Sequence, residues 1–267
     1  MPSLRILIVG GGIAGLALGR ALREQGVVPE IIERAASWPT RGTGLYLPGN
    51  GVRALGALGL ADTVLARAVC MSHQRILDHT GRQLAKIDLA ELWNRVGLCV
   101  GIARGELHRI LLECAVGVPM RLGATVTMLS QQDGEGDVAF ADSSTGTYDL
   151  VVGADGIHSS IRQLVFGSIR PRHLGQVSWR FLVDQSGGVE TWTAMLASRR
   201  TFLAMPVGPN RLYCYADLAT AATEDPTGRD RRRFLALFAD FGEPVPSILS
   251  GLGNFDSIYF SPIEEVV

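Results

Sequence analysis

Residues 4–16 read Leu-Arg-Ile-Leu-Ile-Val-Gly-Gly-Gly-Ile-Ala-Gly-Leu, an apolar run that ends in a cluster of glycines. Within it, Gly10, Gly12 and Gly15 have the spacing Gly-x-Gly-x-x-Gly. Small and apolar residues continue at helical spacing over 16–22, and strand character returns over 27–33. The stretch therefore predicts a strand, a tight turn and a helix that lead into a second, parallel strand.

Each glycine of this motif has a physical role in such a turn. Gly10 permits the tight turn, Gly12 lets the backbone approach a pyrophosphate, and Gly15 allows the helix to pack closely on the sheet. The first helical residues, Ile13 and Ala14, offer unpaired N–H groups and a partial positive charge to a phosphate. We therefore expect a dinucleotide to bind at this turn.

Glu33 stands at the end of the second predicted strand, 18 positions after Gly15. A carboxylate there can accept hydrogen bonds from both hydroxyls of an adenosine ribose. It would repel a 2′-phosphate, so the pattern indicates FAD or NAD rather than NADP in this fold. A glutamate that merely lies on the surface is the alternative.

A second landmark is Asp-Leu-Val-Val-Gly-Ala-Asp-Gly-Ile-His-Ser-Ser-Ile-Arg at residues 149–162. Here a strand again ends in glycine, and Asp155-Gly156 precedes a helix that Ser159 or Ser160 could cap. This places flexible backbone near a ligand. A turn that serves folding alone is the alternative.

Residues 34–50 predict a long loop. Beyond it, apolar residues at helical or at strand spacing predict further elements. The turn residues 78–81 predict a hairpin, and the three strands between 126 and 152 predict an antiparallel meander. The predicted strands are 75–77, 83–87, 126–129, 138–141, 148–152, 177–183, 191–196, 202–205 and 212–216, and the predicted helices are 51–58, 61–68, 106–116 and 229–241.

These elements predict an α/β protein with two lobes. A Rossmann-like nucleotide-binding lobe, formed by 1–72 and 100–172, combines the parallel sheet with the meander. A second lobe, rich in β-sheet, takes 73–99 and 173–267 and would bind the substrate.

Charge and composition exclude several classes of partner. With 25 basic and 26 acidic residues the net charge is −1, which argues against nucleic acid. No stretch approaches the roughly 20 apolar residues of a spanning helix, and the N-terminus lacks the features of a secretory signal. We expect a soluble, cytoplasmic protein without stable membrane insertion. The spacing of its four cysteines indicates buried thiols, with neither a metal site nor a disulfide framework.

Taken together, the glycine motif and residues 149–162 resemble the paired fingerprints of FAD-dependent aromatic-ring hydroxylases of the para-hydroxybenzoate and salicylate hydroxylase type. The resemblance makes FAD the expected cofactor of the first lobe. It implies that Asp155 and Gly156 approach the ribityl chain and pyrophosphate, and that Arg34 lies along the adenine. Arg104 would approach the ribityl-phosphate region, where a guanidinium can neutralise an oxyanion.

The resemblance also implies a reaction. NADH or NADPH, as a transient co-substrate, would reduce FAD, and dioxygen would then form a flavin hydroperoxide that hydroxylates an aromatic or related electron-rich small molecule. The loop 41–47 would border the substrate, with Tyr46 as a lining residue. Arg180 could also touch the substrate, with core packing as the alternative. Tyr213 and Tyr215 share one face of a predicted strand and could also line it, although core packing is the alternative. No general base or oligomeric state is predicted.

One family landmark is missing, a third motif of Gly-Asp-Ala followed by His. The chain ends at Val267, near where that segment would be approached, so we expect a shortened form that lacks the C-terminal part of the first lobe. Two alternatives stay open. The chain could be a related flavin oxidoreductase, such as an epoxidase, halogenase or reductase, or a catalytically silent nucleotide-binding module.

Overall fold

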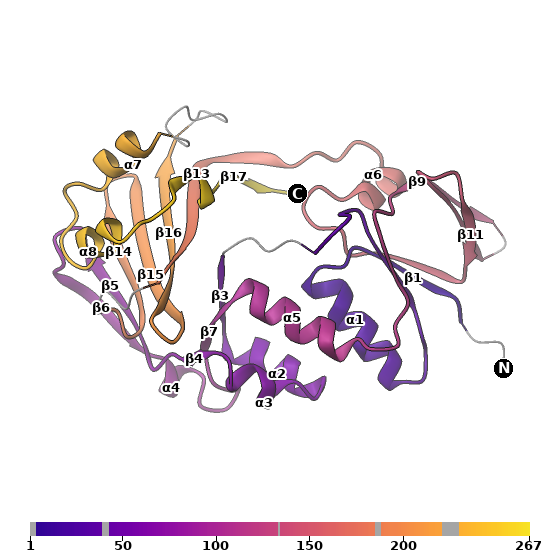
Figure 1. The fold of residues 1–267 in the computed structure, drawn as a ribbon, viewed down its shortest axis with the longest axis horizontal. Helices are drawn as coiled ribbons and strands as arrows, with labels where there is room; N and C mark the ends of the chain where they lie inside the picture. Colours follow the sequence, from indigo (N-terminus) through magenta and orange to yellow (C-terminus); the bar gives the residue numbers. More distant parts are fainter. Residues whose placement is uncertain (1–3, 39–42, 133, 185–187, 221–229) are drawn as a thin grey trace. The chain divides into compact units, whose positions relative to one another are not determined.

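The computed structural model describes residues 4–38, 43–132, 134–184, 188–220 and 230–267 (Figure 1). Arg41 and Gly42 of the predicted loop, and Arg229 at the start of a predicted helix, lie outside these residues. The chain divides into two compact units. Unit 1 consists of Met1–Thr40, His108–Arg172 and Glu264–Val267, and unit 2 of Arg41–Leu107 and His173–Ile263.

Unit 1 is built on a four-stranded parallel sheet. Its strand order is β12 (Leu150–Gly153), β1 (Ile6–Val9), β2 (Glu30–Glu33) and β8 (Met120–Leu122). All four residues of β1 are buried, as an apolar run in a central strand requires. Helix α1 (Ile13–Glu24) lies against β1 and β2. The predicted β-α-β unit is confirmed, with a second strand shorter than predicted.

A separate antiparallel meander of β9 (Val126–Gln132), β10 (Glu135–Phe140) and β11 (Thr145–Tyr148) also belongs to unit 1. The prediction of a third meander strand over 148–152 was wrong in part. The Tyr148 side chain is buried in the core beneath the meander, and from Leu150 the chain pairs with β1 instead. Helix α6 (Ser160–Phe166) follows β12, and α5 (Arg104–Cys114) begins in unit 2 and ends in unit 1.

Unit 2 is built on a seven-stranded sheet. Its strand order is β17 (Tyr259–Glu265), β13 (Arg172–Val183), β16 (Arg211–Ala219), β15 (Arg200–Gly208), β14 (Trp192–Ala197), β5 (His73–Asp78) and β6 (Gln83–Asp88). Helices α7 (Arg231–Leu237) and α8 (Val245–Ser250) contribute Phe234 and Ile248 to an aromatic core on one face of this sheet. The short α4 (Leu89–Leu92) follows β6. The predicted strands of the second lobe are confirmed: the strand predicted over 191–196 is shifted by one residue, and the others are longer than predicted at one or both ends.

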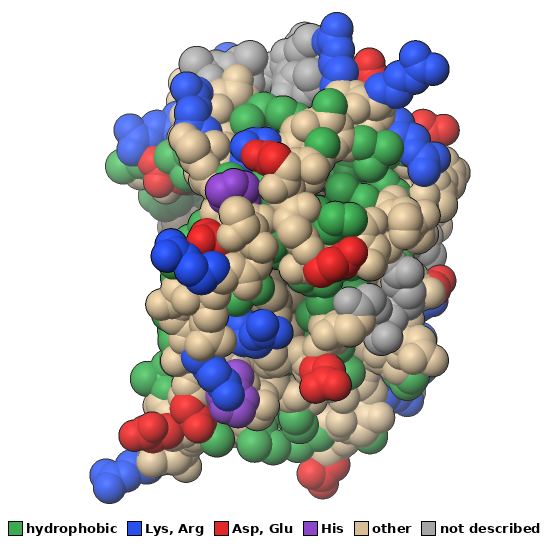
Figure 2. Space-filling model, turned by 90° about the vertical axis from the view of Figure 1, so that its left-hand side faces the viewer, with side chains coloured by type: hydrophobic (Ala, Val, Ile, Leu, Met, Phe, Trp, Pro, Cys, Tyr) green, Lys and Arg blue, Asp and Glu red, His purple; other side chains and the backbone are tan. Residues whose placement is uncertain are grey.

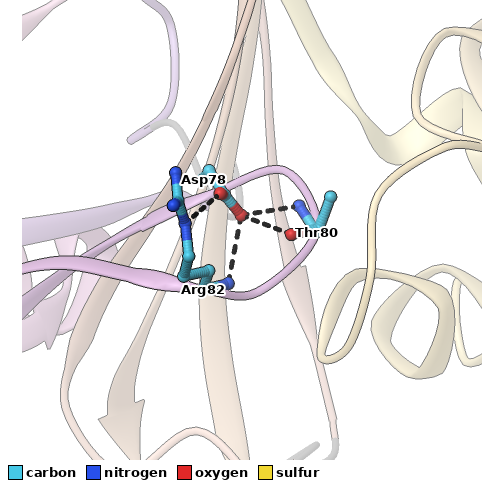
Figure 3. Close-up of polar contacts among 3 residues, drawn as sticks. All are labelled: Asp78, Thr80 and Arg82. Atoms are coloured by element: carbon cyan, nitrogen blue, oxygen red, sulfur yellow. Dashed lines mark hydrogen bonds and ion pairs between the residues drawn. The ribbon is translucent and has the colours of Figure 1, made fainter.

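The β5–β6 hairpin has the turn that its sequence predicts (Figure 3). The Asp78 carboxylate accepts hydrogen bonds from the Thr80 hydroxyl at 2.7 Å and from the backbone N–H groups of Thr80 and Arg82, each at 3.0 Å. The Arg82 side chain donates a further bond at 3.0 Å. The Thr80 hydroxyl is the largest influence on the pKa of Asp78, which falls to about 2, so this turn is held by an ionised carboxylate.

A third sheet of β3 (Gly44–Leu47), β7 (Val100–Ala103) and β4 (Val69–Cys70) explains where the units divide. Its backbone packs directly on the large sheet, because a Cβ on Gly101 would lie 2.3 Å from the Pro206 carbonyl oxygen. A Cβ on Gly44 would lie 2.4 Å from the Tyr213 side chain. Residues 41–72 and 100–107, including α2 (Gly49–Ala57) and α3 (Ala61–Leu65), therefore group with unit 2 and not with the predicted nucleotide-binding lobe.

The surface shows mixed charge. On the face drawn in Figure 2, the described basic and acidic side chains are interspersed among hydrophobic ones. Cys99 and Cys214 are buried as expected, whereas Cys70 is exposed, which contradicts the prediction for that thiol. Among the described residues, no helix is long and apolar enough to cross a membrane.

Phe234 should be a main contributor to the stability of unit 2. Its fully buried ring lies 5.3 Å from the Trp179 ring and 5.3 Å from that of Phe238, so Phe234→Ala leaves a cavity and should cost about 3–5 kcal/mol. Phe166→Ala is the control, since that side chain is 70% exposed and should change stability by less than about 0.5 kcal/mol. Urea unfolding followed by tryptophan fluorescence measures both. Similar effects for the two variants would contradict this packing.

Candidate functional site

Three predicted site segments follow the carboxyl ends of neighbouring parallel strands in unit 1. β1 runs into the glycine turn at 10–15, β2 ends at Glu33, and β12 runs into the turn at 154–157. Open parallel sheets bind ligands outside the carboxyl ends of their strands. The topology thus gathers the glycine motif, Glu33 and Asp155 at one end of one sheet.

The two glycine turns are in direct contact. Gly10 has a φ of 114°, and a Cβ there would lie 2.4 Å from the Ala154 carbonyl oxygen. The Ala154 N–H donates to the Val9 carbonyl oxygen at 2.7 Å. A Cβ on Gly15 would lie 1.9 Å from the Gly10 carbonyl oxygen. Residues 10 and 15 must therefore be glycine for the turn and α1 to approach each other.

Gly12 differs, because open space surrounds it. A Cβ there would meet nothing within 4 Å, and Gly12 caps α1 without a side-chain hydrogen bond. The first N–H groups of a helix have no partner within the helix, and here they include those of Ile13 and Ala14. Free N–H groups, a partial positive charge and open space together fit a pyrophosphate ligand.

The Glu33 carboxylate binds the backbone on both sides of it, at the glycine turn and after β2. One oxygen accepts the Gly11 N–H at 3.0 Å, and the other accepts the Ala35 N–H at 2.9 Å. A carboxylate has about four lone-pair sites, so two can still accept ribose hydroxyls. The ribose role of Glu33 stays a prediction that this geometry permits.

Asp155 anchors the start of α6. Its carboxylate accepts bonds from the Ser159 hydroxyl at 2.5 Å, the Ser160 N–H at 2.7 Å and the Ile161 N–H at 3.2 Å. Ser159 in turn caps the helix by accepting the Arg162 N–H at 2.9 Å. Burial opposes ionisation, but the hydrogen bonds from Ser159, Ile161 and Ser160 outweigh it and lower the pKa of Asp155. An ionised Asp155 therefore fixes the second turn.

Two side chains that the sequence analysis missed complete this part of unit 1. His108 is buried, and its Nε2 atom lies 2.8 Å from the Gly11 carbonyl oxygen. The Trp38 ring lies 5.2 Å from the imidazole, centroid to centroid. Residue 108 stands four positions after Arg104, and this i, i+4 spacing on one helix was the signal that could have drawn attention to it.

In unit 2, three of the four predicted lining residues gather in one cluster. Tyr213 is one of the buried residues of this cluster, and Tyr46 and Tyr215 pack against the cluster as partly buried rings. Arg180 lies opposite Tyr215 in the sheet, with its guanidinium carbon 5.8 Å from that ring. A second ring, that of Tyr259, also lies 5.8 Å from Arg180. We call Tyr46, Arg180, Tyr213, Tyr215 and Tyr259 the tyrosine face.

Strand alternation separates the tyrosine face from the aromatic core. On β13, Trp179 and Phe181 enter the core, so Arg180 between them points to the opposite side. On β16, Cys214 enters the core and its neighbours Tyr213 and Tyr215 do not. The large sheet thus has one face that carries the aromatic core and one that presents hydroxyls and a cation.

Burial keeps these phenols protonated. It is the main cause that raises the pKa of Tyr46, Tyr213 and Tyr215 above the usual value of about 10. Next to them, Asp217 is 9% exposed and accepts the Thr201 N–H at 3.0 Å, and burial raises its pKa. At neutral pH the hydroxyls of Tyr46, Tyr213 and Tyr215 are therefore protonated, and none of these three is ionised to act as a base.

The two predicted cofactor arginines lie in different units. Arg34 follows β2 in unit 1 and is exposed. Arg104 is half-buried at the start of α5 in unit 2, where its backbone N–H donates to the Thr43 carbonyl oxygen at 2.8 Å. Their roles toward the cofactor stay predictions.

Comparisons with known proteins agree with this geometry. A family model described as FAD binding domain matches residues 3–237. The aurachin C monooxygenase/isomerase of Stigmatella aurantiaca is 31% identical over 257 residues, which cover 92% of this chain and 65% of that protein. The 2-heptyl-3-hydroxy-4(1H)-quinolone synthase of Pseudomonas aeruginosa is 29% identical, covering 98% of this chain and 70% of that protein. The chain thus spans about two thirds of the length of these relatives.

A solved structure extends the likeness to the fold. The Klebsiella pneumoniae HpxO protein, complexed with FAD and uric acid, superimposes with a TM-score of 0.89. The match covers 98% of this chain and 68% of that one, at 24% sequence identity. At this identity the likeness shows a shared fold, and both the parallel sheet and the antiparallel sheets are consistent with it.

Gly12→Ala and Gly15→Ala should separate ligand binding from folding. The methyl group at residue 12 meets open space, so stability should be unchanged. It would occupy the space of the pyrophosphate and keep its charged oxygens from the backbone N–H groups, so FAD binding should weaken roughly tenfold or more. The methyl group at residue 15 would collide with backbone, and we expect a loss of about 1–3 kcal/mol or more. Thermal unfolding and the quenching of FAD fluorescence measure the two effects. Unaltered FAD affinity in Gly12→Ala would contradict the assigned phosphate site.

Asp155→Asn should lower the stability of the chain by an amount that depends on pH, because the carboxylate that anchors α6 is ionised. The folded pKa is lowered, so the stability from ionised Asp155 is present above the unfolded value of about 3.9 and is lost as the pH falls through the folded pKa. We expect the variant to be about 1 kcal/mol less stable at pH 7, with a difference that shrinks toward pH 3. Urea unfolding at several pH values tests this. A difference that is independent of pH would show that the charge does not matter.

Proposed function

This chain belongs to the FAD-binding domain family, and from that premise we propose that it acts as an FAD-dependent monooxygenase. The proposed reaction uses NADH or NADPH and dioxygen to hydroxylate an aromatic or related electron-rich small molecule. We place it in the cytoplasm, where reduced nicotinamide coenzymes are available. The contact between the two glycine turns carries this proposal, because it joins the dinucleotide motif to the Asp155 turn at one end of one sheet.

The residues of unit 1 would hold the adenosine and pyrophosphate parts of FAD. The N–H groups of Gly12, Ile13 and Ala14 would bind the pyrophosphate, and the open space beside Gly12 supports this. Glu33 would accept the ribose hydroxyls. The turn at Asp155 and Gly156 would lie along the ribityl chain, with Arg34 and Arg104 as further contacts.

When bound, FAD would supply the redox chemistry, taking electrons from the nicotinamide and activating dioxygen. The chain's own part is to bind the substrate, orient it and exclude water. Protonated Tyr213 can donate a hydrogen bond to a ring oxygen, and Arg180 can attract an anionic group. The apolar residues clustered with Tyr213, among them Leu203 and Met205, would exclude water.

The named relatives support a heteroaromatic substrate. A 4(1H)-quinolone is named for one relative, and uric acid for the protein of similar fold. Both are nitrogen heterocycles that bear oxygen on the ring. A ring of this kind suits a face that offers phenolic donors beside a cation.

The direct test is a coupled assay of the chain after loading with FAD. Oxidation of NADH and of NADPH is followed with 4(1H)-quinolones, uric acid and simple phenols, with catalase present to identify uncoupled peroxide. We expect a bound-flavin spectrum, oxidation that a substrate accelerates, and a product heavier by one oxygen atom. If the chain retains FAD but no compound accelerates oxidation or gains oxygen, the monooxygenase proposal fails and a silent nucleotide-binding module replaces it.

A further inference from the structure

Both backbone polar groups of Gly11 are hydrogen-bonded to side chains, although Gly11 occupies a variable position of the glycine motif. Its N–H donates to the Glu33 carboxylate at 3.0 Å. Its carbonyl oxygen accepts a hydrogen bond from His108 Nε2 at 2.8 Å, across 97 positions of sequence. Because a carbonyl oxygen can only accept, Nε2 must carry the hydrogen.

Packing fixes the imidazole that makes this bond. His108 is 6% exposed, and the Trp38 ring lies beside it at an interplanar angle of 58°. A Cβ on Gly11 would come within 2.6 Å of the Trp38 ring, so residue 11 itself is in close contact with the indole. His108, Trp38 and Gly11 thus form a tightly packed group in unit 1.

The planarity of the peptide gives this bond a consequence for Gly12. The Gly11 carbonyl and the Gly12 N–H belong to one trans peptide unit, so they point in opposite directions from the same plane. When His108 holds the carbonyl oxygen, the Gly12 N–H is fixed toward the other side. A Cβ on Gly12 would meet nothing within 4 Å, so open space adjoins the first turn of α1.

We propose that His108 is a positioning residue for the cofactor. Through the Gly11 carbonyl, it presets the Gly12 N–H and the first turn of α1 for the pyrophosphate before FAD binds. This inference rests on the proposed function for its ligand. Its structural part, the orientation of the Gly11–Gly12 peptide by a donor at Nε2, applies to the chain without ligand.

Three substitutions separate this hydrogen bond from packing. The side-chain nitrogen of His108→Gln reaches the place of Nε2, whereas that of His108→Asn reaches only the place of Nδ1, and His108→Leu fills space without a donor. We expect the Gln variant to bind FAD within about twofold of the wild-type affinity. The Asn and Leu variants should bind about three- to tenfold more weakly, as the loss of one neutral hydrogen bond requires.

Hydrogen exchange of the FAD-free chain gives a readout that does not depend on the ligand. The amides of Gly10 and Gly11 are bonded to the Ile32 carbonyl and to Glu33, so exchange in a peptide covering 10–16 reports the order of the turn. It should be faster in His108→Asn than in the wild type and unchanged in His108→Gln, with equal exchange over the meander at 126–140. Thermal unfolding checks that all variants are folded.

The outcomes divide clearly. Rescue by Gln but not by Asn supports the positioning role. Equal behaviour of Gln and Asn in both measurements overturns it, since packing alone would then explain any effect. If the wild-type chain itself binds no FAD, the proposed function fails, and exchange over 10–16 alone decides whether His108 positions the turn.

Discussion

The close approach of the backbone at Gly10 to that at Ala154 is the constraint on which the remainder of unit 1 depends. The Ala154 carbonyl oxygen lies only 2.4 Å from where the Cβ of any other residue would stand. The two turns are far apart in the sequence, and this contact is possible because the strands that precede them, β1 and β12, are neighbours in the parallel sheet. It also explains why Glu33 and Asp155, which are far apart in the sequence, both lie against the glycine turn.

The two units contribute different chemistry. Unit 1 offers backbone N–H groups. These can bind a phosphate whatever side chains the residues of the turn carry. Unit 2 offers side chains from one face of a large sheet, where alternation places an aromatic core behind and tyrosines with Arg180 in front. In the proposed function, unit 1 would bind the cofactor and the tyrosine face would select the substrate.

The local parts of this structure could be predicted from the sequence, and the long-range parts could not. The turn at Gly10–Gly15 and the hairpin at Asp78 depend on residues close in sequence, whose periodicity and turn chemistry are visible directly. At Asp149 the chain leaves the meander for the parallel sheet. This change of sheet depends on a partner strand some 140 positions away. The bond from His108 to Gly11 spans 97 positions, and no local pattern encodes it.

In the proposed function, both glycine turns of unit 1 bind one FAD molecule. Hydrogen exchange of the chain with and without FAD, resolved by peptide, tests this most directly. We predict that FAD slows exchange in two separate segments, 10–16 and 153–160, and leaves the meander at 126–140 unchanged. Protection of the first segment alone, or of neither, would contradict the claim that the Asp155 turn belongs to the cofactor site.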